Sequence, residues 1–496
     1  MRLLFFYTCS MSVKAGLRSI ASNTIWMTGA SVAQKIISFG YFWFLAHRVS
    51  LETLGLYTFA LSYTTLFSIG TDIGMASVLV RDGARDPEQL WGLYRRMIRV
   101  KVLTCVVTYS LLLIAAVAVG YDSTKLLLIS IAGIAMLLDS IHLTNYAALR
   151  ALHNTRYEAM GMVGSQALTL VLGVTALLMH APLWVLLLAY GVSSACNVLW
   201  STFQLLRHPQ VVALRVAGSD SSLLRGGVRA LLRVAFPFAL AGIFTRVYSS
   251  LDAVLLERLA GDAALGLYSA PYKIAFAFQF IPMALVASLY PLLSHAAAHD
   301  IAQIPRIFRA AMTYLLAIAI PLFAGTVVVG DALLVALFGA KYAGAGTVLS
   351  LMMASLIFAF ASFPVGSVLN AMHLQKAQTV IMGIVMVLNA VLNIMLIPHL
   401  GAVGAAIAAV VGYVVLFGAG LVWMQRVVVV AWRPMVWHVF LILAATGCMV
   451  VALLLLRAVG MSSVLPLIVI GGVVYVGSLM LMGGRALLRA RSSFNG

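Results

Sequence analysis

Long apolar runs, separated by short polar segments, recur along almost the whole chain. A helix that crosses a bilayer needs about 20 consecutive apolar residues, and the pattern predicts about fourteen such helices. The predicted spans cover residues 22–46, 54–80, 97–120, 126–149, 157–179, 183–206, 233–258, 264–294, 307–330, 345–370, 377–397, 401–424, 436–457 and 463–482. We therefore expect an all-α polytopic membrane protein.

The composition agrees with this prediction. The 496 residues are 63% hydrophobic and only 9% charged, whereas a soluble protein is about 25% charged. The formal net charge is +18, which in a soluble protein would suggest a nucleic-acid partner. Here most of the 32 Lys and Arg, including those from Arg81 to Lys101, lie in segments on the same side as the N-terminus. This bias predicts that both termini are cytoplasmic.

The chain also contains an internal repeat. Leu54–Tyr63 (LGLYTFALSY) resembles Leu265–Ile274 (LGLYSAPYKI), and Ala148–Arg156 (ALRALHNTR) resembles Val368–Lys376 (VLNAMHLQK). The matches are short, but they follow the same order in both halves. We expect two copies of a six-helix unit that have the same orientation in the membrane and are related by an axis along the membrane normal.

The repeat and the polar segments predict the domain organisation. The expected parts are a cytoplasmic N-terminal segment (1–21), an N-lobe of helices 1–6 (22–206), a cytoplasmic inter-lobe linker (207–232), a C-lobe of helices 7–12 (233–424), helices 13–14 (425–482) and a cytoplasmic tail (483–496). Within the linker, Leu223–Leu232 is expected to form an interfacial amphipathic helix. Residues 1–10 are read as an upstream extension, with Met11 as an alternative start.

Charged residues inside the predicted spans are candidates for function, because ionisable groups at membrane depth are costly and usually face a bundle interior or an aqueous cavity. Three of them are bases, Lys35, Arg246 and Lys273. Lys35 and Arg246 occupy equivalent positions of the repeat, near the middle of their spans. Two such cations on either side of a pseudo-twofold axis would bind an anion, and a guanidinium offers a planar fork to phosphate oxygens.

Three embedded acids, Asp72, Asp139 and Asp252, are candidates for coupling transport to a proton or sodium ion. The alternative is that they are counter-ions that hold helices together, with Lys35 paired to Asp72 and Arg246 paired to Asp252. Tyr residues of these segments are candidates for a sugar-binding surface, although Tyr is also common at membrane interfaces. The members of this set are Tyr57, Tyr248, Tyr268 and Tyr272.

No catalytic, cofactor or metal motif is present in the sequence. The chain has no HExxH, P-loop or GxSxG pattern, and its four Cys are scattered without CxxC spacing. His295, His299 and Asp300 are read as solvated loop residues. Prolines inside predicted spans allow kinks. These are Pro237, Pro271, Pro282, Pro291, Pro321 and Pro364.

Several short motifs resemble the polysaccharide flippases, the Wzx-type branch of the MATE-like exporter superfamily, over residues 20–425. The motifs of the first half are Gly55-Leu-Tyr57, Gly70-Thr-Asp72-Ile-Gly74 and Arg81. Those of the second half are Phe236-Pro237-Phe238, Asp252, Gly266-Leu-Tyr268, Ala270-Pro-Tyr272-Lys273, Pro291, Leu337-Phe338-Gly339 with Tyr342, and Leu388-Asn389 through Pro398 to Gly404-Ala405-Ala406. Asp139 and Pro271 do not map to the family pattern.

This resemblance implies two six-helix lobes with two extra helices, and alternating access between the two faces of a bacterial inner membrane. It implies that the substrate is a short oligosaccharide on an undecaprenyl-pyrophosphate carrier, moved from the cytoplasmic to the outer leaflet. By the same analogy, the pyrophosphate lies between Lys35, Arg246 and Lys273, with Tyr268 and Tyr272 as further substrate contacts. The polymerase and other polysaccharide assembly proteins are the implied partners, and no cofactor is implied.

Other functions remain open at this point. A peptidoglycan-precursor flippase would also carry a pyrophosphate, and a multidrug exporter of the same superfamily would favour an acidic cavity. A polymerase or ligase embedded in the membrane would need a large outer loop that bears Arg, His or carboxylates. The predicted outer loops are short, so we expect a transporter and no enzyme.

Overall fold

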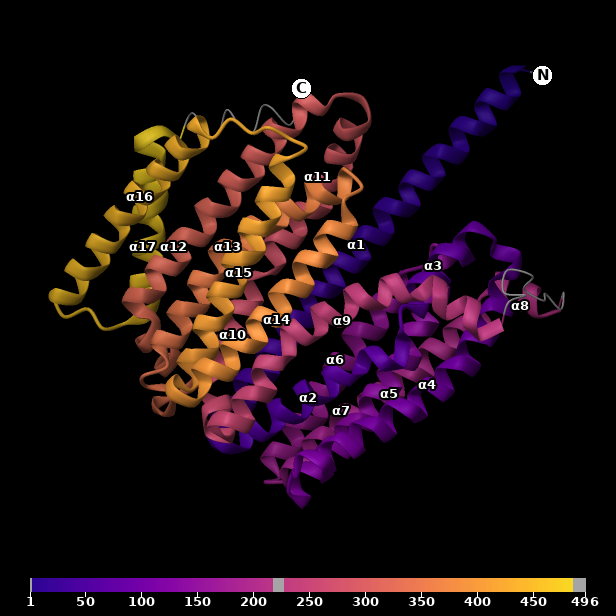
Figure 1. Ribbon diagram of the computed structural model, residues 1–496, viewed down its shortest axis with the longest axis horizontal. Helices are drawn as coiled ribbons and strands as arrows, with labels where there is room; N and C mark the ends of the chain where they lie inside the picture. Colours follow the sequence, from indigo (N-terminus) through magenta and orange to yellow (C-terminus); the bar gives the residue numbers. More distant parts are fainter. Residues whose placement is uncertain (1, 217–226, 485–496) are drawn as a thin grey trace. The chain divides into compact units, whose positions relative to one another are not determined.

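A computed structural model describes residues 2–216 and 227–484, and within these ranges every regular element is a helix (Figure 1). The α-helices are α1 (Arg2–Arg48), α2 (Leu51–Asp72), α3 (Met75–Arg85), α4 (Leu90–Val119), α5 (Ser123–Ala151), α6 (Arg156–Leu178), α7 (Leu183–Arg207), α8 (Pro209–Val216), α9 (Gly227–Ala260), α10 (Asp262–Phe278), α11 (Phe280–His299), α12 (Ile304–Phe338), α13 (Gly346–Ala371), α14 (Gln375–Leu400), α15 (Ala402–Gln425), α16 (Arg433–Ala458) and α17 (Val464–Leu479). The short helices are η1 (Pro87–Gln89), η3 (Ile301–Gln303), η4 (Ala340–Tyr342) and η5 (Met480–Gly484). The predicted all-α class is therefore confirmed.

Among the described residues, 11 helices are long and apolar enough to cross a membrane, or 12 if the bent pair α2 and α3 forms one span. The expected count of about fourteen is not confirmed. Helices α1 and α9 are not among the 11, although they are 47 and 34 residues long. The chain is a multi-pass membrane protein.

The chain divides into two compact units. The first contains residues 1–49 and 56–250, and the second contains residues 50–55 and 251–496. The first unit includes the N-terminal part of α9, where a Cβ added to Gly242 would lie 2.8 Å from Cδ1 of Ile69 on α2. The change of unit therefore falls inside the continuous helix α9, between Ser250 and Leu251. The expected domain boundaries stay a prediction.

In the first unit α5 packs against α7, α3 and α4, while α6 packs against α7 and α1. Buried amides and hydroxyls join α5 to α7: Asn145 donates to Ser201 at 3.0 Å, and the Tyr146 hydroxyl donates to Asn197. Polar groups away from water are costly unless they are hydrogen-bonded. These bonds therefore also fix which faces of the two helices meet.

Helices α2 and α3 are separated by a bend of 41°. Ile73 and Gly74 have φ angles of 45° and 76° at the break. A β-branched residue such as isoleucine rarely adopts a positive φ. Asp72 supports the turn, because its carboxylate accepts a hydrogen bond from the Ala76 backbone amide at 3.3 Å.

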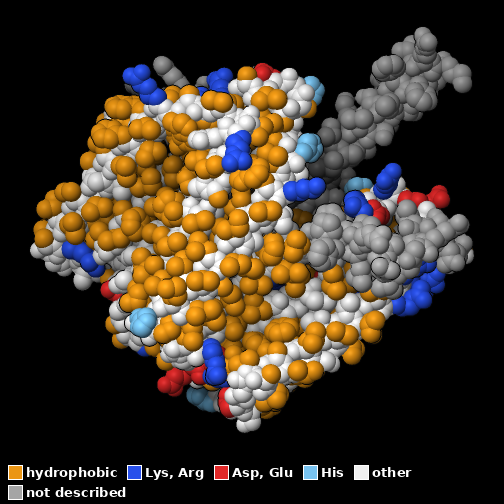
Figure 2. Space-filling model, in the orientation of Figure 1, with side chains coloured by type: hydrophobic (Ala, Val, Ile, Leu, Met, Phe, Trp, Pro, Cys, Tyr) orange, Lys and Arg blue, Asp and Glu red, His pale blue; other side chains and the backbone are white. Residues whose placement is uncertain are grey.

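The second unit is built around α13, which packs against α12 and α15, while α14 packs on α15. Helices α16 and α17 pair with each other and with α12, as the yellow and orange ribbons of Figure 1 show. Figure 2 shows that hydrophobic side chains cover most of this face of the unit, with Lys and Arg mainly near its edges. Val436, Trp437 and Phe440 of α16 are each more than half exposed. Such a surface suits contact with lipid chains.

Equivalent turns close corresponding helices in the two units. His153 follows α5 with φ 55°, and His373 follows α13 with φ 59°. Their backbone amides donate to the carbonyls of Arg150 and Asn370, respectively. In each turn the next residue donates to the carbonyl five positions earlier, which is the bonding of a Schellman C-cap. The paired His residues that suggested the repeat therefore adopt the same backbone conformation.

Several expected boundaries differ from the structure. The predicted span 264–294 lies within one candidate span, Asp262–His299, but the helix is interrupted at Gln279 between α10 and α11. Pro282 in the first turn of α11 provides no amide hydrogen for a helical bond. Of the predicted helix Leu223–Leu232, residues 223–226 lie outside the described ranges, and the remainder forms the first turns of α9. Most of the predicted tail at 483–496 also lies outside them.

Candidate functional site

Asp72 forms an ion pair that sequence reasoning did not anticipate. Its Oδ1 lies 2.8 Å from Nζ of Lys101 on α4. The lysine side chain is 1% exposed, and its ammonium also donates to the Ser140 carbonyl of α5 at 3.0 Å. The pair therefore joins the broken α2–α3 segment to α4 and α5, which favours a counter-ion role for this acid.

This arrangement corrects two parts of the sequence analysis. The sequence placed Lys101 among the cytoplasmic bases, but the structure buries it inside the first unit. The structure also pairs Asp72 with Lys101, whereas the counter-ion alternative paired Asp72 with Lys35. The sequence could have indicated this burial, because Lys101 lies inside the predicted span 97–120 and not in a loop.

Asp139 of α5 accepts two hydrogen bonds from side chains. His142 Nε2 lies 3.1 Å from Oδ1, and the Tyr190 hydroxyl of α7 lies 2.5 Å from Oδ2. The guanidinium of Arg246 interacts electrostatically with Tyr190. The first unit thus brings an acid, an imidazole, a phenol and an embedded base into one electrostatic neighbourhood.

His142 and Tyr190 are functional candidates that the sequence analysis missed. His142 stands three residues after Asp139, a spacing that places two side chains on one helix face. That spacing could have identified His142 as a partner of Asp139. Tyr190 lies on a different helix, and only tertiary packing reveals that it is a partner of Asp139.

The embedded bases are accessible to different degrees. Arg246 is exposed on α9, while Lys35 on α1 and Lys273 on α10 are partly exposed. Lys35 and Arg246 belong to the first unit, and Lys273 belongs to the second. Convergence of these three cations on one anion therefore stays a prediction.

Asp252 lies in a different environment from Asp72. It is 7% exposed, and its carboxylate accepts a 2.5 Å hydrogen bond from the Tyr268 hydroxyl and a 2.8 Å bond from the Ala253 amide. Tyr272 and Tyr413 interact with it electrostatically. Across residues 2–216 and 227–484, no Lys or Arg lies within ion-pair distance of this carboxylate. The partners of Asp252 are therefore hydroxyl and amide groups rather than the Arg246 guanidinium of the counter-ion alternative.

Tyr268, Tyr272 and Phe276 form a ladder along α10. Neighbouring ring centroids lie 5.9 Å and 6.0 Å apart, with nearly parallel planes. Tyr268 is only 3% exposed, and its hydroxyl is hydrogen-bonded to Asp252. The geometry therefore assigns Tyr268 to support of the carboxylate, and leaves the more exposed Tyr272 as the better candidate for substrate contact.

In the part of the chain that the structure describes, no three His, Cys, Asp or Glu side chains are arranged to hold a metal ion. The three embedded acids have other partners: an ammonium for Asp72, an imidazole and a phenol for Asp139, and a phenol and an amide for Asp252. Ionisable residues inside membrane spans commonly mark a pathway for a substrate or an ion. A coupling role for these acids stays a prediction.

The family comparison accounts for this combination of an all-helical membrane fold and embedded charges. The model described as "Polysaccharide biosynthesis protein" matches residues 20–297, and the MatE model matches residues 237–395. The first match covers more than half of the chain. The chain therefore belongs to the polysaccharide biosynthesis protein family, within the MOP superfamily, as the motifs indicated.

Two curated relatives come from Haloferax volcanii. "Probable flippase AglR" is 30% identical over 166 residues, which are 32% of this chain and 34% of that protein. "Probable low-salt glycan biosynthesis flippase Agl15" is 24% identical over 169 residues, or 34% of this chain and 36% of that protein. The chain thus matches about a third of the length of either relative.

Solved structures resemble the fold over a much larger part of the chain. "Lipid II flippase MurJ, inward closed conformation" matches with a TM-score of 0.73 and 14% identity, over 93% of this chain and 100% of that one. An inward-facing multidrug resistance MATE family transporter of the MOP superfamily matches with a TM-score of 0.66 and 15% identity, over 81% and 94%. At these identities the likeness establishes the fold alone.

Proposed function

We propose that this protein is a flippase that moves an undecaprenyl-pyrophosphate-linked oligosaccharide from the cytoplasmic to the outer leaflet of a bacterial inner membrane. The match of residues 20–297 to the polysaccharide biosynthesis family carries the proposal. The two Haloferax relatives, both described as flippases, support the reaction type. Carrier lipid, direction and membrane are part of the proposal.

In this proposal the pyrophosphate is bound by the embedded bases. Arg246 and Lys35, both in the first unit, are proposed to supply charge to it, and Lys273 stays the third candidate. A phosphate group crossing a low-dielectric region needs compensating positive charge, which guanidinium and ammonium groups provide. Tyr272 contributes an aromatic face beside Lys273.

Asp252 is proposed to couple transport to an ion gradient. A buried carboxylate is costly in its charged form unless it has a partner, and the neighbours of Asp252 are phenols and an amide. Uptake of a proton or a monovalent cation removes that cost. Asp139, with His142 and Tyr190, is the equivalent candidate in the first unit.

The direct test is reconstitution of the purified full chain in liposomes that contain a fluorescent undecaprenyl-pyrophosphate oligosaccharide. A quencher outside the liposomes reports the fraction of labelled lipid in the outer leaflet. This quenched fraction should increase with time only when the protein is present. A chain that polymerises or transfers the glycan without moving it between leaflets would contradict the proposal.

A multidrug exporter is the second candidate, because the MatE match at residues 237–395 includes Asp252. A buried acid surrounded by aromatic rings is suited to a lipophilic cation. Expression in a drug-sensitive strain separates the two functions. The flippase proposal predicts unchanged resistance to cationic drugs together with restored surface glycan in a strain that lacks its flippase.

A further inference from the structure

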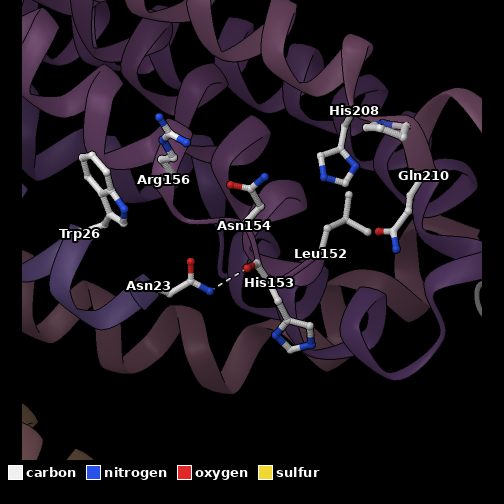
Figure 3. A pocket seen from close by; sticks show the side chains of 9 residues that line it. Asn23, Trp26, Leu152, His153, Asn154, Arg156, His208 and Gln210 are labelled. Atoms are coloured by element: carbon white, nitrogen blue, oxygen red, sulfur yellow. Dashed lines mark hydrogen bonds between the residues drawn. The ribbon is translucent and has the colours of Figure 1, made fainter. Parts of the chain in front are cut away.

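A polar pocket of about 530 Å³ lies within the first unit, and its lining includes none of the acids and bases described above. It is formed where α1, the turn between α5 and α6, and the junction of α7 with α8 meet (Figure 3). Its lining residues are Asn23, Trp26, Leu152, His153, Asn154, Arg156, His208, Pro209 and Gln210. The lining therefore contains amides, imidazoles and a guanidinium, but no acid.

Backbone conformation and hydrogen bonds hold this pocket in shape. The Asn23 side-chain amide donates to the His153 carbonyl at 2.7 Å, the bond drawn in Figure 3, and the Thr155 hydroxyl donates to the Asn23 carbonyl at 3.3 Å. The positive φ of His153 sets the direction of the turn. Figure 3 shows Asn154 between Arg156 on one side and His208 on the other.

The positive charge of the pocket has no acidic partner. Among the described residues, Arg156 forms no ion pair, and its guanidinium lies 5.3 Å from the centre of the Trp26 ring. The nearby acid Glu158 lies 3.3 Å from Arg150 instead. A cation held in place by an aromatic ring and left without a counter-ion is available to an anionic ligand.

Neutral donors complete the lining. Nδ1 of His208 is buried and has no hydrogen-bond partner. Burial lowers the pKa of His208, so its ring is neutral at pH 7 and one nitrogen carries a hydrogen to donate. The side-chain amides of Asn154 and Gln210 add further donors. Several donors around one guanidinium match the oxygens of a phosphate better than a single carboxylate.

We propose that this pocket binds the phosphate group of a membrane lipid. The charge bias of the sequence places the α5–α6 turn at the cytoplasmic surface, the depth of lipid headgroups. Two lipids carry such a group there: the pyrophosphate-linked substrate and an anionic phospholipid. The first source rests on the proposed function, whereas the second does not.

The second unit offers a matched control. Its equivalent turn places Leu374 where the first unit has Asn154, and Lys376 where the first unit has Arg156. The repeat thus preserves the turn and the positive charge but not the amide. A Lys376→Gln variant removes one cation at an equivalent turn without changing the pocket.

The experiment is isothermal titration of inorganic pyrophosphate into the full chain in phosphatidylcholine nanodiscs. Every sample carries Lys35→Ala and Arg246→Ala, so that the bases proposed above do not bind the probe. Saturable binding is expected for this parent chain and after Lys376→Gln is added, and binding at least tenfold weaker after Arg156→Gln is added. Asn154→Ala should also weaken binding, and it replaces Arg156→Gln in the test if that variant does not fold. Unchanged affinity in both pocket variants, or no binding by the parent chain, would overturn the proposal.

A second arm identifies the source of the phosphate. If the site serves the substrate, farnesyl pyrophosphate should bind more tightly than inorganic pyrophosphate, and phosphatidylglycerol should have no effect. If it serves a phospholipid, phosphatidylglycerol nanodiscs should raise the melting temperature of the wild type but not of Arg156→Gln. If the pocket does not bind phosphate, translocation in liposomes should still be observed. The pocket proposal and the flippase proposal can therefore be contradicted separately.

Discussion

Gly55 and Gly266 make reciprocal contacts at the start of α2 and α10. A Cβ added to Gly55 would lie 1.9 Å from the carbonyl oxygen of Asp262, and one added to Gly266 would lie 1.9 Å from that of Leu51. The two glycines belong to the repeated LGLY motif. Each helix therefore places its glycine against the first residue of the other, as local twofold symmetry requires.

Alanine at Gly266 should destabilise this crossing. A methyl group at 1.9 Å from backbone oxygen cannot be accommodated unless the helices separate, and overpacking of this kind costs about 1–3 kcal/mol. We expect a lower melting temperature for Gly266→Ala in detergent, and the same for Gly55→Ala. Gly418→Ala is the control, because nothing lies within 4 Å of its added Cβ. Equal melting temperatures for all three variants would contradict the close contact.

Removal of Lys101 should destabilise the first unit, because it leaves the Asp72 carboxylate without its partner. Loss of one member of a buried ion pair costs about 3–5 kcal/mol, and the 30% exposure of Asp72 favours the lower value. Lys101→Met should therefore lower the melting temperature clearly. The double variant Asp72→Asn with Lys101→Met should recover part of the loss. A double variant as unstable as the sum of the single variants would exclude a direct pairing energy.

Neutralising Asp252 should uncouple transport from the ion gradient. Asp252→Asn keeps the size of the side chain and an oxygen for the Tyr268 hydrogen bond, but it cannot take up a proton. In proteoliposomes, an imposed gradient should stimulate glycan movement in the wild type and not in the variant. Tyr268→Phe is the companion variant, expected to shift the pH dependence and retain coupling. Full gradient response in Asp252→Asn would assign coupling elsewhere, with Asp139 tested next.

The embedded bases should be essential for glycan export. Lys35→Ala and Arg246→Ala should each reduce export at least tenfold at normal protein level, since each removes a charge proposed to bind pyrophosphate. Lys35→Arg should retain more activity than Lys35→Gln. Arg457→Ala, at the end of α16, is the control with expected normal export. Normal surface glycan in both alanine variants would exclude the anion-binding role.

Helix positions followed closely from the sequence. The predicted spans 157–179 and 183–206 agree with α6 at Arg156–Leu178 and α7 at Leu183–Arg207. The bilayer explains this success, because backbone groups in hydrocarbon must be bonded within the helix and apolar length alone defines a span. The end of α12 was predicted less accurately, because the span was expected to end at residue 330 and the helix continues to Phe338. Asp331, inside this extension, accepts hydrogen bonds from the Gly344 and Gly346 amides.

The sequence by itself determined the fold class, the family, the repeated motifs and the residue types that carry charge into the membrane. The tertiary structure decided their partners: Lys101 for Asp72, Tyr190 for Asp139, and Tyr268 for Asp252. Periodicity predicts which face of a helix is polar, but not which other helix that face meets. A pairing across 29 or 51 positions depends on how whole helices pack, and that depends on all of their side chains together.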